Sequence, residues 1–427
     1  MKIQELHQLF LTTTGATTDT RKIKIQSMFF ALKGENFDAN IFAKQALALG
    51  AKYVIIDNKD YFIDKSTILV EDCLKTLQTL ASYHRNYLQI PIIAITGSNG
   101  KTTTKELIQV VLRKKFQAGA TIGNFNNHIG VPLTLLSFNR NTQIGIVEMG
   151  ANHQKEIEFL CKLAEPDYGY ITNFGKAHLE GFGGVSGVIK GKSEMFTHLK
   201  DNHKIAFINQ DDPVQVVKSK EIESYSFSNT SNDAFLKIDT ISASPFLKIS
   251  FKGTVIQSKL IGIYNANNVA AAILIGKFFE ISDSDIKNAI ESYVPENNRS
   301  QMTVKNSNQI ILDAYNANPS SMKVAIENFL QIENANKTVF LGDMFELGAE
   351  SHFEHQIIVN SLAQSSTVMC YFVGKYFFKC RIQLSHFAFF ETFELLKEHI
   401  ETLRIQNNAI LIKGSRGMAL ERILDCI

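Results

Sequence analysis

The chain has 427 residues, of which 45% are hydrophobic and 20% charged, and its 44 basic and 42 acidic side chains give a formal net charge of +2. This near balance of charge does not favour a nucleic acid or a membrane surface as the main partner. At about 150 residues per domain the length predicts roughly three domains, with enough apolar residues for several cores.

The ends and cysteines of the chain indicate a cytoplasmic protein. The N-terminal stretch MKIQELHQLFLTTTGATTDT has no apolar core of a signal peptide. No apolar run approaches the ~18 residues of a membrane span. The five cysteines are scattered without CxxC spacing, so we expect reduced thiols. We expect a cytoplasmic monomer with no membrane span and no nucleic-acid partner.

Residues 1–88 are predicted to form a small α/β unit. The short apolar runs SMFFAL and KYVIID indicate strands, and NIFAKQALALGA between them has helical spacing and ends at Gly50. The segment TLQTLASYHRNYL then predicts a connecting helix that stops before Pro91.

A second unit is predicted over residues 89–293. Strands at IPIIAIT, IGIVEM, YGYIT and IAFIN alternate with helical stretches, the first of which has an apolar face of Leu107, Ile108, Val111 and Leu112. This alternation predicts a mostly parallel sheet with helices on both faces. FLKISFKGTVIQSKL predicts an added hairpin, and NANNVAAAILIGKFF predicts a helix.

Residues 294–427 repeat the alternation, with strands predicted at QIILDAY, KTVFLGD, VMCYFVG and AILIKGS. No GxGxxG sequence occurs in this part, so dinucleotide binding is not supported.

The segment TGSNGKTTTKE places a glycine loop between the strand IPIIAIT and a helix. This order exposes backbone N–H groups and a helix N-terminus to a phosphate. Lys101 would reach the β- and γ-phosphates, and the Thr102 hydroxyl would bind Mg²⁺. The usual GxxxxGK[ST] spacing needs a glycine where Ile95 stands, so a glycine-rich turn with a surface lysine is the alternative. The predicted fold class is α/β with three domains, in which a small N-terminal α/β domain and a C-terminal Rossmann-like domain flank a central P-loop domain.

Two polar residues follow neighbouring predicted strands of the central unit. Glu148 comes after IGIV, and His178 comes after YGYIT. Ligands of open α/β sheets collect at the carboxyl ends of the strands. A carboxylate and an imidazole beside a phosphate loop suit a metal that organises phosphate, for which Mg²⁺ is the natural choice although it prefers oxygen ligands. Taken singly, a solvated acid and a structural histidine are the alternatives.

These residues resemble those of the Mur ligases, the ATP-dependent amide-forming enzymes of peptidoglycan precursor synthesis. The phosphate loop of that family has the short form TGxxGK[ST], which accounts for Ile95. Similar segments cover nearly the whole chain in the family's order: TDTRKI, FFALKGENFDANIFAKQAL, GNFNNHIGVPLTLL, VEMGANHQKEI, TNFGKAHLEGFGG, ILDAYNANPSSM, LGDMFELG and IKGSRGMALE. Two of them, GNFNNHIGVPLTLL and VEMGANHQKEI, resemble the subgroup that adds a D-alanyl-D-alanine dipeptide.

The resemblance implies a role for each matching residue. The implied catalytic residues are Lys101, Glu148, His178 and Lys192, and the implied ligands of two Mg²⁺ ions are Thr102, Glu148, His178 and Lys192. The implied contacts of ATP are Thr96, Gly97, Ser98, Asn99, Gly100, Lys101, Thr102, Thr103, Asn265, Asn268, Arg299 and Asp313. The implied contacts of the other substrates are Thr20, Arg21, Lys33, Gly34, Phe37, Asp38, Asn124, Asn126, Asn127, Tyr315, Asn316, Asn318, Lys413, Ser415 and Arg416.

Lys192, in KGKSEMF, matches the lysine that in this family reacts with CO₂ to give a carbamate. A carbamate replaces a cation by a metal-binding oxyanion, and only the neutral amine can form it. Burial or neighbouring cations are therefore expected to lower the pKa of this lysine. Lys190, two residues earlier, is the alternative.

Two positions depart from the family pattern. Tyr264 stands first in the family's HNxxN motif, whose asparagines are present as Asn265 and Asn268, so a contact at position 264 is not implied. In PENNRSQM, the pair NN precedes Arg299 where the family often has Pro-Gly.

The resemblance implies an ATP-dependent ligase that joins D-alanyl-D-alanine to UDP-N-acetylmuramoyl-tripeptide through an acyl phosphate, giving the pentapeptide, ADP and phosphate. It implies that residues 1–88 bind the uridine nucleotide and residues 89–293 bind ATP. Residues 294–427 would close on ATP and bind the dipeptide. Catalysis would rest on positioning and charge neutralisation, and closure would keep water from the acyl phosphate.

Three alternatives remain open. A ligase acting one step earlier should carry DNP[RA] where DAYNANPSSM stands. Folylpolyglutamate synthase shares the phosphate loop and the carbamate but lacks a unit like residues 1–88. A non-catalytic nucleotide-binding module should have lost some of the four implied catalytic residues, and all four are present. The third residue of the acceptor peptide is either diaminopimelate or lysine.

Overall fold

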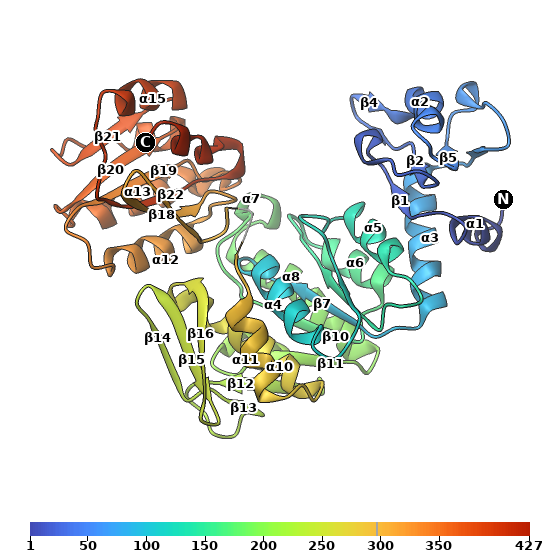
Figure 1. Cartoon of the computed structure of the whole chain (residues 1–427), viewed down its shortest axis with the longest axis horizontal. Helices are drawn as coiled ribbons and strands as arrows, with labels where there is room; N and C mark the ends of the chain where they lie inside the picture. Colours follow the sequence, from blue (N-terminus) through green and yellow to red (C-terminus); the bar gives the residue numbers. More distant parts are fainter. Residues whose placement is uncertain (296–297) are drawn as a thin grey trace.

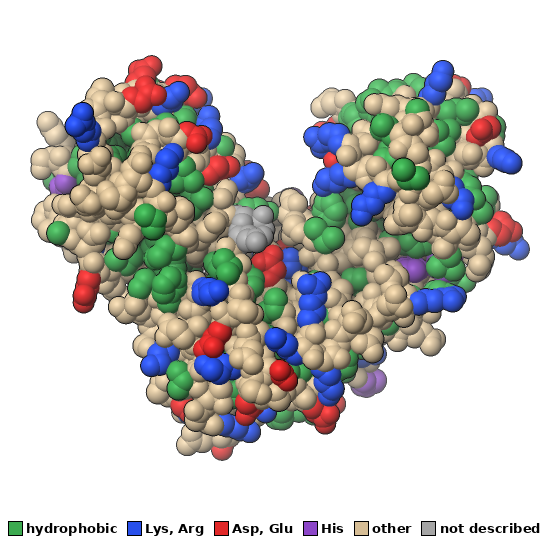
Figure 2. All heavy atoms as spheres, viewed as in Figure 1, with side chains coloured by type: hydrophobic (Ala, Val, Ile, Leu, Met, Phe, Trp, Pro, Cys, Tyr) green, Lys and Arg blue, Asp and Glu red, His purple; other side chains and the backbone are tan. Residues whose placement is uncertain are grey.

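The computed structural model describes residues 1–295 and 298–427, so Asn297, one of the two asparagines before Arg299, lies outside the described residues. The chain forms an N-terminal, a central and a C-terminal part, each built on its own sheet. Figure 1 shows the N-terminal and C-terminal parts on opposite sides of the central part. Figure 2 shows an open notch between these two outer parts.

The N-terminal part is a four-stranded parallel sheet in the order β1-β2-β5-β6, with a two-stranded hairpin of β3 and β4. Its helices and strands are α1 (Ile3–Phe10), β1 (Ala16–Thr17), β2 (Met28–Phe30), β3 (Lys33–Gly34), β4 (Phe37–Asp38), α2 (Ala43–Ala48), β5 (Tyr53–Ile56) and β6 (Thr67–Leu69). The predicted strands at SMFFAL and KYVIID are confirmed as β2 and β5. The predicted helix between them is divided, because a 3₁₀ turn over Ala39–Phe42 precedes α2.

Helix α3 (Cys73–Leu88) leads from the N-terminal part into the central part and packs against α1, α5 and α6 (Figure 1). Asp72 caps its first turn, and Gln89 ends it in a left-handed conformation before Pro91. His84 bonds the Phe138 carbonyl, with 2.9 Å between Nε2 and the oxygen. This long helix therefore fixes the N-terminal part to the central part through buried polar contacts as well as apolar ones.

The central part is built on seven parallel strands in the order β13-β12-β11-β10-β7-β9-β8. The strands are β7 (Ile92–Thr96), β8 (Ala118–Ala120), β9 (Ile144–Glu148), β10 (Tyr168–Ile171), β11 (Ile205–Asn209), β12 (Ser224–Ser228) and β13 (Leu236–Lys237). The helices are α4 (Lys101–Leu112), α5 (Gly130–Ser137), α6 (Glu156–Ala164), α7 (Leu179–Phe182), α8 (Val185–Asp201), α9 (Pro213–Lys218), α10 (Ala266–Phe278) and α11 (Asp283–Ser292).

Both faces of the central sheet are covered by helices, as the continuous apolar strands predict. On β7, Ile93 and Ile95 belong to the same core as residues of α4 and α10, whereas Ile92 and Ala94 belong to the core that includes α5, α6 and α8. This alternation follows from the two-residue period of a strand. The β7 strand lies inside the sheet between β10 and β9, so the loop that follows it opens at the carboxyl edge beside the ends of these two strands.

A second, antiparallel sheet follows β13 and has the strands β14 (Thr240–Ala243), β15 (Phe246–Phe251) and β16 (Thr254–Ile261). The hairpin predicted at FLKISFKGTVIQSKL is confirmed as β15 and β16, and β14 adds a third strand.

The C-terminal part has six strands in the order β17-β18-β22-β19-β20-β21, all parallel except for the edge strand β17. Its elements are β17 (Gln301–Lys305), β18 (Asn308–Asp313), α12 (Pro319–Leu330), β19 (Lys337–Gly342), α13 (Ser351–Ala363), β20 (Val368–Val373), α14 (Lys375–Lys379), β21 (Phe387–Phe390), α15 (Phe393–Glu401) and β22 (Ala409–Lys413). The four strands predicted here are confirmed as β18, β19, β20 and β22. The α/β class with a parallel central sheet is confirmed as well.

No helix among the described residues is long and apolar enough to cross a membrane. The five cysteines are free, and four of them are buried: Cys73, Cys161, Cys370 and Cys380, with Cys426 half-buried. The reduced thiols expected from their spacing are thus what the structure contains.

Arg85 offers a test of how α3 is fixed to the central part. Its guanidinium is 9% exposed and bonds the Ala164 and Glu165 carbonyls and the Asp167 carboxylate at 2.9–3.0 Å. Arg85→Ala should lower the free energy of unfolding by about 2–3 kcal/mol, because buried hydrogen bonds to a charged group are lost together. Urea denaturation of the purified variant measures this loss.

Arg113→Ala is the matched control, because this exposed arginine makes a single 3.4 Å bond to the Ala118 carbonyl. Its effect should stay within about 0.5 kcal/mol. Equal losses in the two variants would contradict the structural role of Arg85.

Candidate active site

The glycine loop after β7 is crowded at two positions that a side chain could not occupy. Gly97 has φ +139°, and a Cβ there would lie 2.0 Å from Thr172 Oγ1. Gly100 has φ +79°, and its Cβ would lie 2.5 Å from Asn268 Oδ1. Only glycine combines these left-handed angles with such close approach. The loop thus turns directly from the strand into α4, which begins at Lys101.

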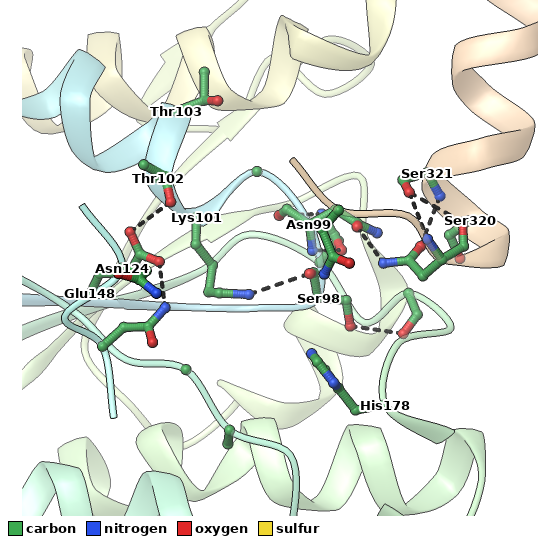
Figure 3. Close-up of a pocket in the computed structure, with 18 of the residues that line it drawn as sticks. Ser98, Asn99, Lys101, Thr102, Thr103, Asn124, Glu148, His178, Ser320 and Ser321 are labelled. Carbon is green, nitrogen blue, oxygen red and sulfur yellow. Dashed lines mark hydrogen bonds between the residues drawn. The ribbon is translucent and has the colours of Figure 1, made fainter. Parts of the chain in front are cut away.

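Lys101 folds back over this loop, where its ammonium donates to the Gly97 carbonyl at 2.7 Å and to the Ser98 carbonyl at 3.3 Å (Figure 3). Burial lowers the pKa of Lys101 below its ordinary value, and nearby Glu148 partly opposes that shift. A phosphate group in the loop would replace the carbonyls as the partner of the ammonium.

The Glu148 carboxylate faces the start of α4. Its Oε2 accepts a hydrogen bond from the Thr102 hydroxyl at 2.9 Å, and its Oε1 accepts one from the Asn126 amide at 2.8 Å (Figure 3). Lys105 lies 4.0 Å from the same carboxylate and is buried. Glu148 itself is 1% exposed, so the alternative of a solvated acid at a strand end does not apply.

Lys192 lies on α8 and is 1% exposed, whereas Lys190 two residues earlier is exposed. The Lys192 ammonium donates to the Ala151 carbonyl at 3.2 Å and lies 5.1 Å from the centre of the Phe182 ring. Burial lowers the pKa of Lys192 well below its ordinary value, and the charge of Lys101 lowers it further. These surroundings favour the neutral amine that carbamate formation requires.

His178 precedes α7 with φ +52°, a left-handed backbone that is uncommon outside glycine. Figure 3 shows its imidazole projecting toward the phosphate loop. The Nδ1 atom contacts the carboxylate of Glu346, which comes from the loop after β19 in the C-terminal part. The resemblance implies that His178 binds a metal. The structure adds a carboxylate partner, Glu346, at the Nδ1 atom of its ring.

Two asparagines of the NANN segment, Asn265 and Asn268, support the phosphate loop. Asn268 Oδ1 accepts from the Thr104 hydroxyl at 3.1 Å, and its amide donates to Asn265 Oδ1 at 2.8 Å. Tyr264 points away toward the C-terminal part, where its hydroxyl donates to Ser300 Oγ at 2.8 Å. The tyrosine that departs from the family pattern therefore contacts the residue next to Arg299.

Charged groups of the C-terminal part approach the loop from the other side. The Lys413 ammonium lies 2.5 Å from Asp313 Oδ2, and the backbone N–H of Ser300 donates to Asp313 Oδ1. The Arg299 guanidinium stacks 3.6 Å from the centre of the Tyr315 ring, and its buried Nε has no hydrogen-bond partner among the described residues. A guanidinium with a buried, unused Nε donor is suited to an anionic ligand.

Asn318 is the N-cap of α12 and accepts from the backbone N–H of Ser321 at 2.9 Å. Its amide also donates to Asn99 Oδ1 of the phosphate loop at 2.7 Å. Both ends of this side chain are engaged, which favours a structural role for Asn318 in shaping the turn before Pro319. Asn316 is engaged locally, because its Oδ1 accepts from the N–H of Ala317.

A cavity of about 1270 Å³ lies between the central and C-terminal parts. Of the residues that the resemblance implicates, those that line it are Ser98, Asn99, Gly100, Lys101, Thr102, Thr103, Asn124, Asn126, Asn127, Glu148, His178, Asn265, Asn268, Arg299, Asp313, Tyr315, Asn316, Asn318 and Lys413. Thr96 is buried beneath the loop and donates its hydroxyl to the Met149 carbonyl. Segments separated by more than 300 residues in the sequence therefore meet at one site.

Two implicated residues of the C-terminal part, Ser415 and Arg416, are not among the residues that line this cavity. Ser415 is buried, and its hydroxyl accepts from the backbone N–H of Phe345 at 3.0 Å. Arg416 is exposed and bonds Glu421 at 2.9 Å, with its guanidinium 5.9 Å from the Tyr315 ring centre.

The implicated residues of the N-terminal part lie apart from this cavity, on the loops of the first sheet. Arg21 is largely exposed and forms a two-fold contact with Asp19 at 2.9 Å. Lys33 contacts Asp57 at 2.9 Å. The other four residues are Thr20 in a 3₁₀ turn, Gly34 and Phe37 in the β3–β4 hairpin, and Asp38, which accepts from the N–H of Asn40.

A second cavity of about 860 Å³ lies where the N-terminal part meets α5 and the loop before it. Its lining includes Asp19, Lys22, Phe125 and Arg140. The Lys22 ammonium lies 5.2 Å from the centre of the Phe125 ring, so the two parts contact each other across this cavity.

The donors near the phosphate loop fit Mg²⁺ only in part as they stand. Among the described residues there is no cluster of three His, Cys, Asp or Glu side chains placed to hold a metal. Thr102 and Glu148 supply oxygen atoms at one place, which suits Mg²⁺. A carbamate on Lys192 would supply further oxygen atoms, whereas the unmodified lysine and His178 each offer only a nitrogen.

Sequence reasoning missed Glu346 and Lys105. Glu346 belongs to LGDMFELG, which was recognised as a family segment without a role for its acid. Its position could have indicated a role, because Glu346 is a carboxylate that follows the strand predicted at KTVFLGD, and ligands collect at the carboxyl ends of such strands. Lys105 follows the phosphate loop by one helical turn, and that spacing from Lys101 could have placed it near Glu148.

Models of known protein families match two long stretches of the chain. The Mur ligase middle domain matches residues 95–276, and the Mur ligase, glutamate ligase domain matches residues 298–416. The chain belongs to the Mur ligase family. Within it, the chain is 36% identical to the UDP-N-acetylmuramoyl-tripeptide–D-alanyl-D-alanine ligase of Bacillus subtilis, over 96% of this chain and 92% of that protein.

Solved structures agree over the full length. The chain is similar to MurF from Acinetobacter baumannii, with a TM-score of 0.86 and 29% identity, over 99% of this chain and 98% of that one. It is also similar to MurF ligase from Thermotoga maritima in complex with ADP, with a TM-score of 0.84 and 25% identity, over 98% of this chain and 97% of that one.

Gly97 offers a test of the phosphate loop. Gly97→Ala should weaken ADP binding by at least about tenfold, because the new Cβ cannot coexist with Thr172 and a distortion costing 1.4 kcal/mol already gives that factor. Isothermal titration calorimetry with ADP and Mg²⁺ measures the affinity.

Gly253→Ala is the control, because Gly253 also has a positive φ of +76° but no atom of the described residues lies within 4 Å of a Cβ built there. It should cost about 1–2 kcal/mol of stability and leave ADP affinity unchanged. Unchanged ADP affinity in Gly97→Ala would show that the nucleotide does not use this loop.

Proposed function

We propose that this protein is an ATP-dependent ligase that joins D-alanyl-D-alanine to UDP-N-acetylmuramoyl-tripeptide, giving the UDP-linked pentapeptide, ADP and phosphate. The observation that carries this function is the cavity in which the phosphate loop and Glu148 of the central part meet Arg299 and Asp313 of the C-terminal part. The relatives over the whole length of the chain support the same activity and the same substrates.

The chemistry activates a carboxylate and then consumes it. A terminal carboxylate oxygen of the tripeptide attacks the γ-phosphorus of ATP, and the bond from that phosphorus to the ADP oxygen breaks. The amine of D-alanyl-D-alanine attacks the carbonyl carbon of the acyl phosphate through a tetrahedral intermediate and loses a proton. Phosphate leaves with the former carboxylate oxygen, and an amide remains.

The chain contributes to this reaction mainly by position and charge. Lys101 would leave the Gly97 and Ser98 carbonyls to bind the transferred phosphate. Arg299, with its unused Nε, would bind the same group from the C-terminal part. These cations would neutralise the charge that gathers as the phosphate passes from ADP to the carboxylate.

Two Mg²⁺ ions would supply further charge neutralisation when bound. Thr102 and Glu148, already 2.9 Å apart, would hold the first ion. His178 and a carbamate on Lys192 would hold the second. The low pKa of the buried Lys192 amine supports carbamate formation, since CO₂ reacts with the neutral form.

The three parts would divide the substrates. The N-terminal part, residues 1–88, would bind the uridine nucleotide through Arg21, Lys33 and their neighbours, because these exposed cations, in a 3₁₀ turn and in β3, lie away from the ATP site. Asn124, Asn126 and Asn127 line the main cavity on its central side and would face the peptide. Residues 89–293 would hold ATP.

The incoming dipeptide would bind to the C-terminal part, residues 294–427. Tyr315, Asn316 and Lys413 line the cavity, and the Lys413 ammonium donates to the Asn316 carbonyl at 3.2 Å. Arg416 is exposed near Tyr315 and could pair with the carboxylate of the dipeptide. The strand-to-helix turn at Asn318 would hold this surface against the phosphate loop, through its bond to Asn99.

Steady-state kinetics tests the proposed substrates. Phosphate release with UDP-N-acetylmuramoyl-tripeptide should require D-alanyl-D-alanine, and D-alanine alone should give a much lower kcat/KM. A site built for a dipeptide leaves buried polar groups unpaired when a single amino acid enters, at a cost of about 1–3 kcal/mol for each group. If L-lysine or diaminopimelate on the UDP-linked dipeptide gave the higher kcat/KM, the enzyme would act one step earlier.

Variants of the two lysines in KGKSEMF distinguish a specific carbamate from a nonspecific contribution of basic side chains. Lys192→Ala should abolish ligation and leave thermal unfolding nearly unchanged, whereas Lys190→Ala should keep full activity, because Lys190 is exposed. Nuclear magnetic resonance with ¹³C-bicarbonate should show one carbamate signal that disappears only in Lys192→Ala. Full activity of that variant, or an unchanged carbamate signal, would exclude this role for Lys192.

A further inference from the structure

The contact between His178 and Glu346 has a consequence beyond the roles assigned above. His178 belongs to the loop before α7 in the central part, and Glu346 belongs to the loop between β19 and the 3₁₀ turn at Gly348–Glu350 in the C-terminal part. Their side chains meet through His178 Nδ1 and a Glu346 carboxylate oxygen. Two segments 168 residues apart in the sequence are joined at an imidazole that faces the phosphate loop.

The two residues that make this contact both have an uncommon backbone conformation. His178 has φ +52° and Glu346 has φ +62°, so both residues are left-handed without being glycine. Such conformations cost of order 1 kcal/mol or more and persist where surrounding contacts impose them. Here the N–H of Glu180 donates to the Glu346 carbonyl, and a Cβ at Gly348 would pack 3.2 Å from the Glu180 side chain.

Further contacts fix the same loop to the C-terminal part. The Lys176 ammonium lies 2.6 Å from Glu354 Oε1, and the backbone N–H of Lys176 donates to Ser320 Oγ at 2.9 Å. Glu354 is buried, whereas the Lys176 side chain is 45% exposed, so the ion pair is only partly removed from water. The loop that carries His178 is therefore placed by the C-terminal part as much as by its own sheet.

The chemistry of imidazole decides what the Glu346 contact does. A carboxylate accepts, so Nδ1 must carry the hydrogen, and in the neutral ring Nε2 then has the free lone pair. A metal binds to that lone pair. A carboxylate on the other ring nitrogen fixes the tautomer and the ring orientation and makes the metal-binding nitrogen more basic.

We propose that Glu346 is the positioning residue for His178, so that the site of the second divalent cation is completed by the C-terminal part. This inference rests on the proposed function, since it needs His178 to bind a metal. It adds that the cation site spans two parts of the chain. With the C-terminal part docked as in this structure, His178 presents Nε2 to the cavity, and without Glu346 neither the tautomer nor the ring orientation is fixed.

Manganese binding provides a test that does not depend on turnover. The full-length protein is titrated with Mn²⁺ in the presence of ADP and bicarbonate, and free Mn²⁺ is measured by electron paramagnetic resonance. The parent protein should bind two Mn²⁺ ions. Glu346→Ala should weaken one of them by about 10- to 100-fold, as loss of a hydrogen-bonded partner of a metal-binding histidine does elsewhere.

Two further variants complete the test. His178→Ala should weaken the same ion as Glu346→Ala, and Glu350→Gln should weaken neither, because Glu350 is an exposed acid four residues away that does not contact His178. The other ion, held at Thr102 and Glu148, should keep its affinity in all variants. That unchanged ion shows within the same sample that Glu346→Ala is folded.

The possible failures are distinguishable. If His178→Ala weakens one ion and Glu346→Ala does not, the inference is overturned while the proposed metal site stands. Tighter Mn²⁺ binding in Glu346→Ala would overturn it as well, because the carboxylate would then compete with the metal for the histidine. If neither variant changes Mn²⁺ binding, the assignment of His178 to a metal fails, and the inference fails with it.

Discussion

Burial of cationic side chains around the phosphate loop is the constraint on which the rest of the site depends. Lys101 and Lys192 both lose hydration, which lowers the pKa of each, and the charge of Lys101 lowers that of Lys192 further. Arg299 adds a guanidinium whose buried Nε has no partner among the described residues. Such an arrangement is costly unless anions enter. The proposed reaction supplies these anionic groups as phosphate at Lys101 and Arg299, and as the carbamate that CO₂ would form on Lys192.

A second constraint is that no single part of the chain contains the whole site. The central part supplies the phosphate loop and Glu148, whereas Arg299 and Asp313 come from the C-terminal part. The bond between Asn99 and Asn318 joins the loop directly to the start of α12. Docking of the two parts therefore brings together the groups that we propose to bind the phosphate. It would also enclose the place where an acyl phosphate would otherwise meet water.

The parts of this account that the sequence could predict are local or periodic. Strands β7, β9 and β10 are recognisable in the sequence as continuous apolar runs. Such runs occur because helices cover both faces of the sheet, so successive side chains are buried on either side. The short strands β8 and β13 were missed, since two or three residues carry no period. Glu148 was found because its position at a strand end is a local property.

Contacts between distant segments could not be predicted in the same way. Nothing within LGDMFELG indicates that Glu346 meets His178, because that depends on how two sheets dock. The sequence is equally compatible with a contact of Asn318 to the dipeptide and with a turn before Pro319, and only the bonds to Ser321 and Asn99 show that its side chain is already engaged. The sequence also could not tell which of Lys190 and Lys192 is buried, because both lie on α8 and burial depends on how that helix packs.

Isotope transfer tests the central claim, that this site activates a carboxylate with ATP, most directly. UDP-N-acetylmuramoyl-tripeptide whose reacting carboxylate carries two ¹⁸O atoms is converted with ATP and D-alanyl-D-alanine, and the released phosphate is analysed by mass spectrometry. An acyl-phosphate route places one ¹⁸O in each phosphate and leaves the other in the amide carbonyl. Phosphate without ¹⁸O would show that ATP hydrolysis and amide formation are separate events, which would contradict the account.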